Sequence, residues 1–203
     1  MKIVFLGKQG SGKGTQAKML SKELEIPHIS TGDLLRGSTG DLKKKVDEYI
    51  NNGNLVPDSL IFKILDKRFQ NKDCEKGFIL DGLPRNLNQA RELDKIVKIE
   101  KVFEIFISDR EAIKRLGSRL NCKNCGAVFN KETNPPKKEG LCDVCGGEIY
   151  QREDDKEQAI KKRLEIYNKQ TSEVLKYYGS KIIKIEGEQP IKKVFEDILA
   201  EIE

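Results

Sequence analysis

The sequence GKQGSGKGT, from Gly7 to Thr15, has the phosphate-loop spacing G-x-x-x-x-G-K and decides the fold. It follows the apolar run KIVFL at residues 2–6 and precedes TQAKMLSKEL, whose apolar residues have helical spacing. Glycines let backbone N–H groups turn toward a phosphate, and Lys13 adds a positive charge at the start of the helix. Gly14 stands where Ser or Thr is usual. A glycine-rich turn without a ligand is the alternative, but the flanking strand and helix favour a phosphate site.

Three further apolar runs lie at residues 78–80, 101–108 and 181–187, and each precedes a helical pattern. Strands that alternate with helices predict a parallel sheet covered on both faces, with ligands at the carboxyl ends of the strands. We therefore expect an α/β protein with the three-layer P-loop NTPase fold. Asp81 follows the run at residues 78–80. This class of fold places there a carboxylate that organises Mg²⁺ and its waters; a turn former or helix cap is the alternative.

Two segments interrupt the alternation of strands and helices. Residues 30–57 have a helical pattern with glycine breaks and no evident strand, which predicts a small helical lobe. Residues 117–155 contain four cysteines, a Pro-Pro pair and several glycine turns, and a long helix is expected over residues 156–177. We interpret this second segment as an inserted, metal-bound lobe.

The cysteines of that lobe form two C-x-x-C pairs, Cys122 with Cys125 and Cys142 with Cys145, each followed by a glycine. This spacing is typical of tetrahedral Zn²⁺ sites, and four thiolates leave no open position for a substrate, so the metal is expected to be structural. Disulfide pairing is the alternative. Cys74 has no partner nearby and is interpreted as a free thiol.

The chain has 37% apolar and 35% charged residues, and it has no run near the roughly 18 to 20 apolar residues that span a bilayer. This composition predicts a soluble protein without a membrane partner. No signal-peptide pattern follows Met1, which predicts a cytoplasmic location. The net charge of +5 is spread along the chain and favours small anionic ligands over nucleic acid. The single histidine, His28, is assigned to packing.

Five motifs in chain order closely resemble adenylate kinases of the long-lid, zinc-containing kind. They are GKQGSGKGT, ISTGDLLR at residues 29–36, GNLVPDSLI at 53–61, DGLPRNLNQA at 81–90 and RLEIYNKQT at 163–171. The resemblance runs from Lys2 to the final helix. It implies a monomeric enzyme with ATP, AMP and ADP as substrates, which transfers a phosphoryl group reversibly from Mg·ATP to AMP and gives two ADP.

The resemblance also implies how the chain is divided. A P-loop core would comprise residues 1–29, 60–117 and 156–203, an AMP-binding lobe residues 30–59, and a zinc-containing lid residues 118–155. These two lobes coincide with the segments that interrupt the strand and helix alternation. The implied cofactors are Mg²⁺ with ATP and a structural Zn²⁺ on Cys122, Cys125, Cys142 and Cys145.

Site residues follow from the same resemblance. The implied ATP contacts are Gly10, Ser11, Gly12, Lys13, Gly14, Thr15, Arg119, Val128, Phe129 and Gln189. The implied AMP contacts are Thr31, Arg36, Asn54, Leu55, Val56, Gly82, Arg85, Gln89, Arg152 and Arg163. The implied catalytic set is Lys13, Arg85, Arg119, Arg152 and Arg163, with Arg115 at the lid base and Asp33 and Asp81 on the waters of Mg²⁺. Such cations suit phosphoryl transfer because its transition state is rich in negative charge.

Three residues depart from the family pattern. Gln9 replaces the proline usual in the phosphate loop, Leu83 replaces the usual Phe, and Leu120 stands where a second lid arginine is common. The first change should soften the loop without removing a ligand, because proline has no N–H to donate. The last removes one source of charge stabilisation from the lid.

Other functions remain open at this stage. A UMP/CMP kinase would share the chemistry, but that family typically has Ala in place of Thr31 and lacks the long lid. A zinc-ribbon ATPase that binds nucleic acid would need a clustered basic and aromatic face, whereas the basic residues of this lobe alternate with acidic ones. A non-catalytic zinc scaffold leaves the phosphate loop unexplained.

Overall fold

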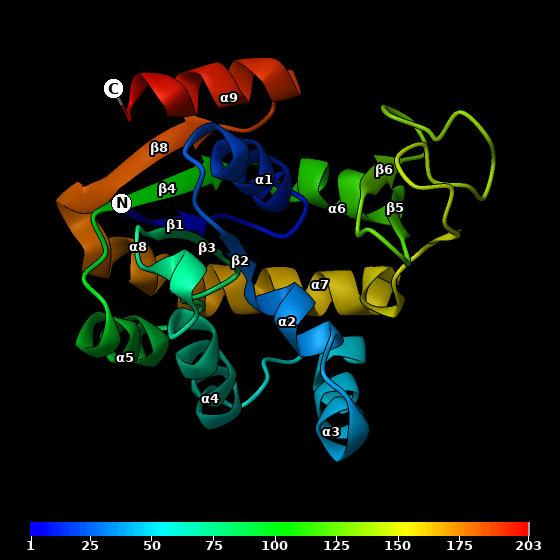
Figure 1. The fold of residues 1–203 in the computed structure, drawn as a ribbon. Helices are drawn as coiled ribbons and strands as arrows, with labels where there is room; N and C mark the ends of the chain where they lie inside the picture. The colour runs from blue at the N-terminus through cyan, green and yellow to red at the C-terminus, as the bar shows by residue number, and fades with distance from the viewer. Residues whose placement is uncertain (203) are drawn as a thin grey trace.

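The computed structural model describes residues 1–202 (Figure 1). In chain order its strands are β1 (Lys2–Leu6), β2 (His28–Ser30), β3 (Phe78–Asp81), β4 (Lys101–Phe106), β5 (Arg119–Cys122), β6 (Val128–Asn130), β7 (Ile149–Tyr150) and β8 (Ile182–Glu186). Its α-helices are α1 (Lys13–Glu23), α2 (Thr31–Arg36), α3 (Gly40–Asn51), α4 (Asp58–Phe69), α5 (Leu87–Ile96), α6 (Asp109–Gly117), α7 (Glu157–Ile166), α8 (Ser172–Tyr178) and α9 (Ile191–Ala200). Short 3₁₀ turns lie at Lys72–Cys74, Glu153–Asp155 and Gly179–Lys181.

Five strands form a parallel sheet in the order β2-β3-β1-β4-β8. The central strand β1 pairs through Val4 with Leu80 of β3 and with Val102 of β4. These three residues are fully buried, as expected for a parallel sheet covered on both faces. The predicted α/β class is confirmed. Strand β2 was not evident in the sequence because it has three residues, of which two are polar.

Alternate residues of β1 enter two different apolar cores, because successive side chains of a strand point to opposite faces. Ile3 and Phe5 pack in the core shared with α1 and α9, whereas Val4 and Leu6 pack in the core shared with α4, α5 and α8. Figure 1 shows α1 and α9 on one side of the sheet and α5 and α8 on the other. The three-layer arrangement follows from a strand whose four residues after Lys2 are all apolar and buried.

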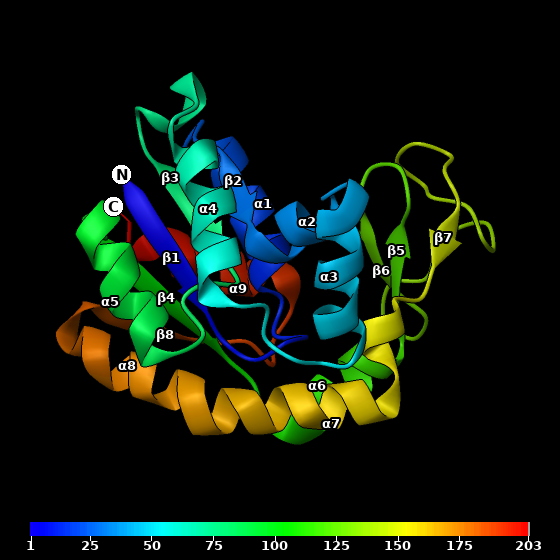
Figure 2. The same ribbon diagram turned by 90° about the horizontal axis from the view of Figure 1, so that it is seen from below.

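Two insertions extend from this layered unit. Helices α2 and α3 project together below the sheet in Figure 1, and the antiparallel sheet β6-β5-β7 lies at the far right. After the second insertion, α7 and α8 run on as one long helix through a π-helical turn at Tyr167–Thr171, best seen in Figure 2. The long helix expected after the cysteine lobe is therefore confirmed.

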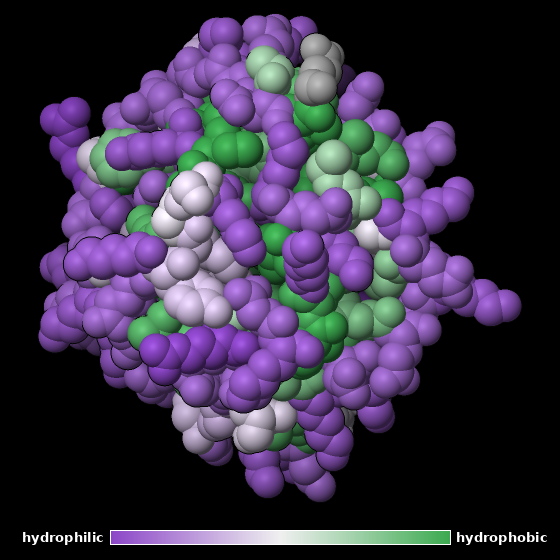
Figure 3. All heavy atoms as spheres, turned by 90° about the vertical axis from the view of Figure 1, so that its left-hand side faces the viewer, coloured by the Kyte–Doolittle hydropathy of each residue, from purple (hydrophilic) through white to green (hydrophobic). Residues whose placement is uncertain are grey.

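Figure 3 shows the face of the molecule that points away from the antiparallel sheet. This face is mainly hydrophilic, with apolar side chains visible between hydrophilic ones. Among the helices of residues 1–202, none is both long and apolar enough to cross a membrane.

Candidate active site

The phosphate loop joins β1 to α1 in a conformation that depends on its glycines. Gly7, Gly10 and Gly12 all have positive φ, and a Cβ at Gly7 would lie 2.3 Å from the Ile105 carbonyl oxygen. Lys13, the first residue of α1, folds back so that its Nζ donates to the carbonyl oxygens of Gly7 and Lys8 at 2.8 Å. The loop therefore presents the N-terminus of a helix together with an ammonium group.

Asp81 ends β3 beside the start of α1. A Cβ built on Gly14 would lie 3.3 Å from Asp81 Oδ2, so the glycine at this position leaves room for the carboxylate to approach the loop. His28 Nε2 lies 3.7 Å from the same oxygen. Burial alone would raise the pKa of Asp81, but His28 and Lys13 hold it below its usual value. The carboxylate is thus charged and placed next to the phosphate loop.

A cavity of about 870 Å³ opens above the loop and is lined by residues from the central sheet, α2 and the antiparallel sheet. The predicted residues that line it are Gly10, Ser11, Gly12, Lys13, Gly14, Thr15, Asp33, Arg36, Leu55, Asp81, Gly82, Arg85, Arg115, Arg119, Val128, Phe129, Arg152, Arg163 and Gln189. Thr31, Asn54, Val56 and Gln89 were also predicted but do not line it. The cavity thus brings together most of the residues that the motifs selected from distant parts of the chain.

Two buried aspartates at the end of the cysteine lobe hold the arginines that enter the cavity. Arg119 donates to Asp155 through Nε at 2.7 Å and Nη2 at 2.5 Å, a bidentate pair. Arg163 Nη1 lies 2.8 Å from Asp154 Oδ2 and 3.4 Å from Asp155 Oδ1. Because Asp154 and Asp155 are buried, these pairs fix the two guanidinium groups where β5 meets α7. Sequence reasoning missed both aspartates; the adjacent acidic pair after Arg152 was the available signal.

The cavity carries more positive than negative charge. Burial, together with the charges of neighbouring arginines and against the effect of Asp81, lowers the pKa of Lys13 to about 8 and that of Arg85 to about 10. Burial and then Arg119 lower the pKa of Arg152 to about 10. Cations that are desolvated and repel one another are strongly stabilised by an anion placed among them. The cavity is therefore electrostatically suited to phosphate groups.

Several of the residues near α2 and α5 are engaged with one another. Arg36 Nη2 donates to Asp33 at 2.7 Å, and Arg36 keeps the pKa of that carboxyl low against the effect of its burial. Thr31 Oγ1 donates to the Asp81 carbonyl oxygen at 3.1 Å. Gln89 is fully buried; its Oε1 accepts from the Arg85 N–H at 2.7 Å and its Nε2 donates to Asp58 at 2.6 Å. Gln89 therefore fixes the backbone of Arg85.

The four lobe cysteines converge on one point, with their sulfur atoms all within 4.8 Å of one another. Two Sγ pairs are 3.5 and 3.6 Å apart, near the roughly 3.8 Å expected between ligands of a tetrahedral ion with 2.3 Å metal–sulfur bonds. Gly126 and Gly146 have positive φ in matching turns, as their place after each C-x-x-C predicted. All five cysteines in residues 1–202 are free thiols, which excludes the disulfide alternative in this structure. The cluster can hold a metal ion.

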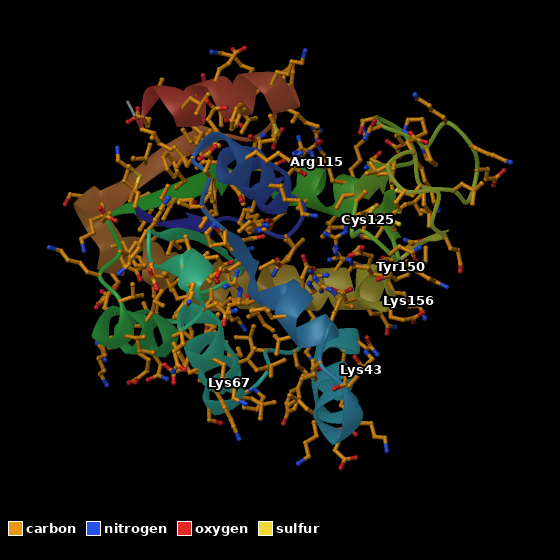
Figure 4. The ribbon with its side chains drawn as sticks, in the orientation of Figure 1. Lys43, Lys67, Arg115, Cys125, Tyr150 and Lys156 are labelled. Atoms are coloured by element: carbon orange, nitrogen blue, oxygen red, sulfur yellow. The ribbon has the colours of Figure 1, made fainter. Side chains whose placement is uncertain are left out.

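Contacts also cross between the lobes and the sheet. Lys18 of α1 donates to the Gly126 carbonyl oxygen at 3.1 Å, and Arg152 lies 3.9 Å from Asp33 of α2. Figure 4 shows Arg115 at the sheet side of this boundary and Cys125 and Tyr150 within the cysteine lobe. His28, which sequence reasoning assigned to packing, also lines the cavity. Neither His28 nor Lys18 belongs to a spacing pattern that would have revealed these contacts.

Comparison with known proteins shows which family this chain resembles. The family model described as adenylate kinase matches residues 5–183. An adenylate kinase of Methanocella arvoryzae is 48% identical over 214 residues, covering 100% of this chain and 98% of that protein. An adenylate kinase of Caldicellulosiruptor bescii is 47% identical over 209 residues, covering 98% and 97%. One of Archaeoglobus fulgidus is 44% identical over 213 residues, covering 100% and 98%.

Proposed function

The chain belongs to the adenylate kinase family of phosphotransferases, and on that premise we propose that it moves the terminal phosphoryl group of Mg·ATP reversibly onto AMP, giving two ADP. One observation carries the proposal: a single cavity is lined both by the phosphate loop with Lys13 and by Arg36 with Arg85. Two phosphate-bearing ligands can therefore meet between them. The comparisons favour neither a UMP/CMP kinase nor a nucleic-acid-binding ATPase.

We assign the donor phosphates to the phosphate loop. Residues 10–15 would bind them through backbone N–H groups, and Lys13 would exchange its two carbonyl partners for phosphate oxygens. Val128, Phe129 and Gln189 line the part of the cavity that we assign to the donor nucleoside. Charge stabilisation by the loop and positioning of the reacting groups account for catalysis, because no nucleophilic side chain is needed for this transfer.

We assign the phosphate of the acceptor to Arg36 and Arg85, with Arg152 and Arg163 approaching from the lid side. In the free protein, Arg119 and Arg163 are held by Asp154 and Asp155, so their positions are set before a nucleotide binds. Preorganised cations stabilise the developing charge of the transition state without a reorganisation cost. This supports a catalytic role for the set Lys13, Arg85, Arg119, Arg152 and Arg163.

Both expected metals suit the groups available to them. Asp33 and Asp81 both line the cavity and supply carboxylate oxygens, the ligand type that Mg²⁺ and its waters prefer. Bound Mg²⁺ neutralises phosphate charge. The four thiols fit Zn²⁺ in number, element and spacing, and a complete set of four protein ligands makes that ion structural. We propose that it orders residues 118–155 as a lid, while residues 30–59 form the AMP-binding lobe.

Selectivity for adenine is assigned to Thr31 and Gln89. A carboxamide can donate and accept, and therefore suits an edge that carries an amino group beside a ring nitrogen. Thr31 lies against Gly82 of the cavity wall, because a Cβ added to Gly82 would lie 2.6 Å from Thr31 Oγ1. Gln89 accepts a hydrogen bond from the Arg85 N–H. To read the base directly, Gln89 would have to release one of its two present partners.

The test is a coupled assay of ADP formation with Mg·ATP and each of AMP, GMP, CMP and UMP, together with size-exclusion chromatography to test the expected monomer. We expect strong preference for AMP, since a mismatched base leaves buried polar groups unpaired at about 1 to 3 kcal/mol each. Gln89→Ala should raise KM for AMP with little change for ATP. Equal use of CMP or UMP would contradict the assignment to AMP while leaving a nucleoside monophosphate kinase.

A further inference from the structure

The phosphate loop contains a tight turn whose geometry does not call for a glutamine. The Ser11 N–H donates to the Lys8 carbonyl oxygen at 3.1 Å, so Gln9 and Gly10 are the two central residues of a β-turn. Gly10 has a φ of 83°, which is the requirement of the second central position in a type II turn. The first central position favours proline because its ring fixes φ. Gln9 therefore keeps the turn but adds a polar side chain.

That side chain enters the cavity without a partner. Gln9 lines the cavity, and its Oε1 is buried and has no hydrogen-bond partner within residues 1–202. Buried polar atoms of side chains are normally paired, so an exception requires an explanation, and at the wall of a ligand cavity a bond that forms with the ligand is one such explanation. Rotation of the terminal amide by half a turn interchanges its oxygen and its NH₂ group, so either can face the ligand.

Gln9 lines the same cavity as the cations of the proposed transfer centre. Lys13 Nζ is held by the carbonyl oxygens of Gly7 and Lys8, the two residues that precede Gln9. The charges of Arg85, Arg163 and Arg119 all act on Lys13, so the donor side and the acceptor side of the cavity approach each other here. A neutral amide can add a hydrogen-bond donor at this place without adding to the repulsion among the cations.

We propose that the Gln9 amide donates a hydrogen bond to a non-bridging oxygen of the phosphoryl group in transfer, and that this bond strengthens as charge grows on that oxygen. The inference rests on the proposed function. In the step, the bond from phosphorus to the ADP oxygen breaks and a bond from phosphorus to an oxygen of AMP forms. Gln9 transfers no proton and stays uncharged, so its contribution is electrostatic.

The experiment compares Gln9→Met, which keeps the length of the side chain without polar atoms, with Gln9→Glu, which replaces the donor by a negative charge. Gln70→Met, at an exposed position after α4, is the control. Removal of one preorganised donor should lower kcat about tenfold for Gln9→Met and about a hundredfold for Gln9→Glu, with KM for ATP and AMP within about twofold. Gln70→Met should match the wild type.

Two further measurements separate this role from a structural one. The affinity for a bisubstrate analogue in which five phosphates join two adenosines, and the Tm of the free protein, should both be nearly unchanged in Gln9→Met, because the bond is weak with bound ground-state phosphates and strong only in the transition state. Unchanged kcat in Gln9→Met, or a loss of kcat matched by weaker analogue binding and a lower Tm, would overturn the inference. Wild-type protein that does not phosphorylate AMP would overturn the proposed function instead.

Discussion

The central sheet and the cysteine lobe are ordered by different means. The sheet separates two extensive apolar cores, and its strands β1, β3 and β4 contribute fully buried side chains to them. In the lobe, the buried cluster consists of Cys122, Phe129 and Cys142, so two of its three members belong to the thiol group. A lobe with so little apolar burial cannot offset its own conformational entropy. We therefore expect the core to be stable without a metal and the lobe to depend on a metal held by its four cysteines.

Ion pairs do not remove this difference. Pairs within the lobe, such as Lys123 with Glu148, are exposed on both sides and contribute little. The pairs of Arg119 and Arg163 with Asp154 and Asp155 are buried, but they lie where the lobe joins α7 and therefore fix its orientation. We therefore expect order inside the lobe to depend on a metal ion bound by its four cysteines.

The largest effect is expected in the core from Lys13→Met. This change removes the ammonium that lies closest to the phosphate loop and should lower kcat by about a thousandfold or more, since several kcal/mol of transition-state stabilisation are lost. Lys22→Met, an exposed change on the same helix, should have wild-type turnover in the same coupled assay. Near-normal turnover of Lys13→Met would refute the phosphate-loop assignment.

In the lobe, Cys142→Ser should abolish stoichiometric zinc and leave residues 118–155 without stable structure, because metal binding supplies the folding free energy of such a site. Elemental analysis and limited proteolysis measure both effects, and the Tm of the core should fall far less. Cys74→Ser lies outside the cluster and should retain one zinc per chain. A protease-resistant lobe in zinc-free Cys142→Ser would remove the distinction between the two regions.

The junction between the regions is tested by Asp155→Asn. Arg119 and Arg163 would lose their shared buried carboxylate, at a cost of about 3 kcal/mol in the free energy of unfolding. Glu153→Gln, in the same turn but in an exposed pair with Lys156, should cost less than about 0.5 kcal/mol. Chemical denaturation measures both values, and equal effects of the two substitutions would show that burial at the junction is unimportant.

The smallest effect is a pH dependence confined to the core. The pKa of Lys13 is lowered to about 8, so in the free protein its side chain carries a positive charge below that pH and loses the charge above it. Phosphates bind the charged form, so Kd for Mg·ATP should rise above pH 8 by up to about tenfold per pH unit. Calorimetric titration should show no such rise for Lys13→Met; an identical slope in that variant would assign the titration to another group.

What the sequence could predict differs between local patterns and long-range contacts. The glycine turns of the phosphate loop and of the C-x-x-C pairs, and four of the five strands of the parallel sheet, are set by neighbouring residues and were predicted correctly. Strand β2 was missed because it exists only by pairing with β3. The contacts of His28 with Asp81, of Lys18 with Gly126 and of Gln89 with Asp58 were missed for the same reason, since each joins residues at least 31 positions apart.

Amide hydrogen exchange of the wild-type protein, with zinc bound and after removal of zinc by a chelator, tests the contrast between core and lobe most directly. We predict that residues 118–155 lose their protection when zinc is removed, while β1, β3 and β4 exchange as slowly as before. Restoring zinc should restore the protection. Equal loss of protection in the core strands, or full protection of the lobe without zinc, would contradict the account.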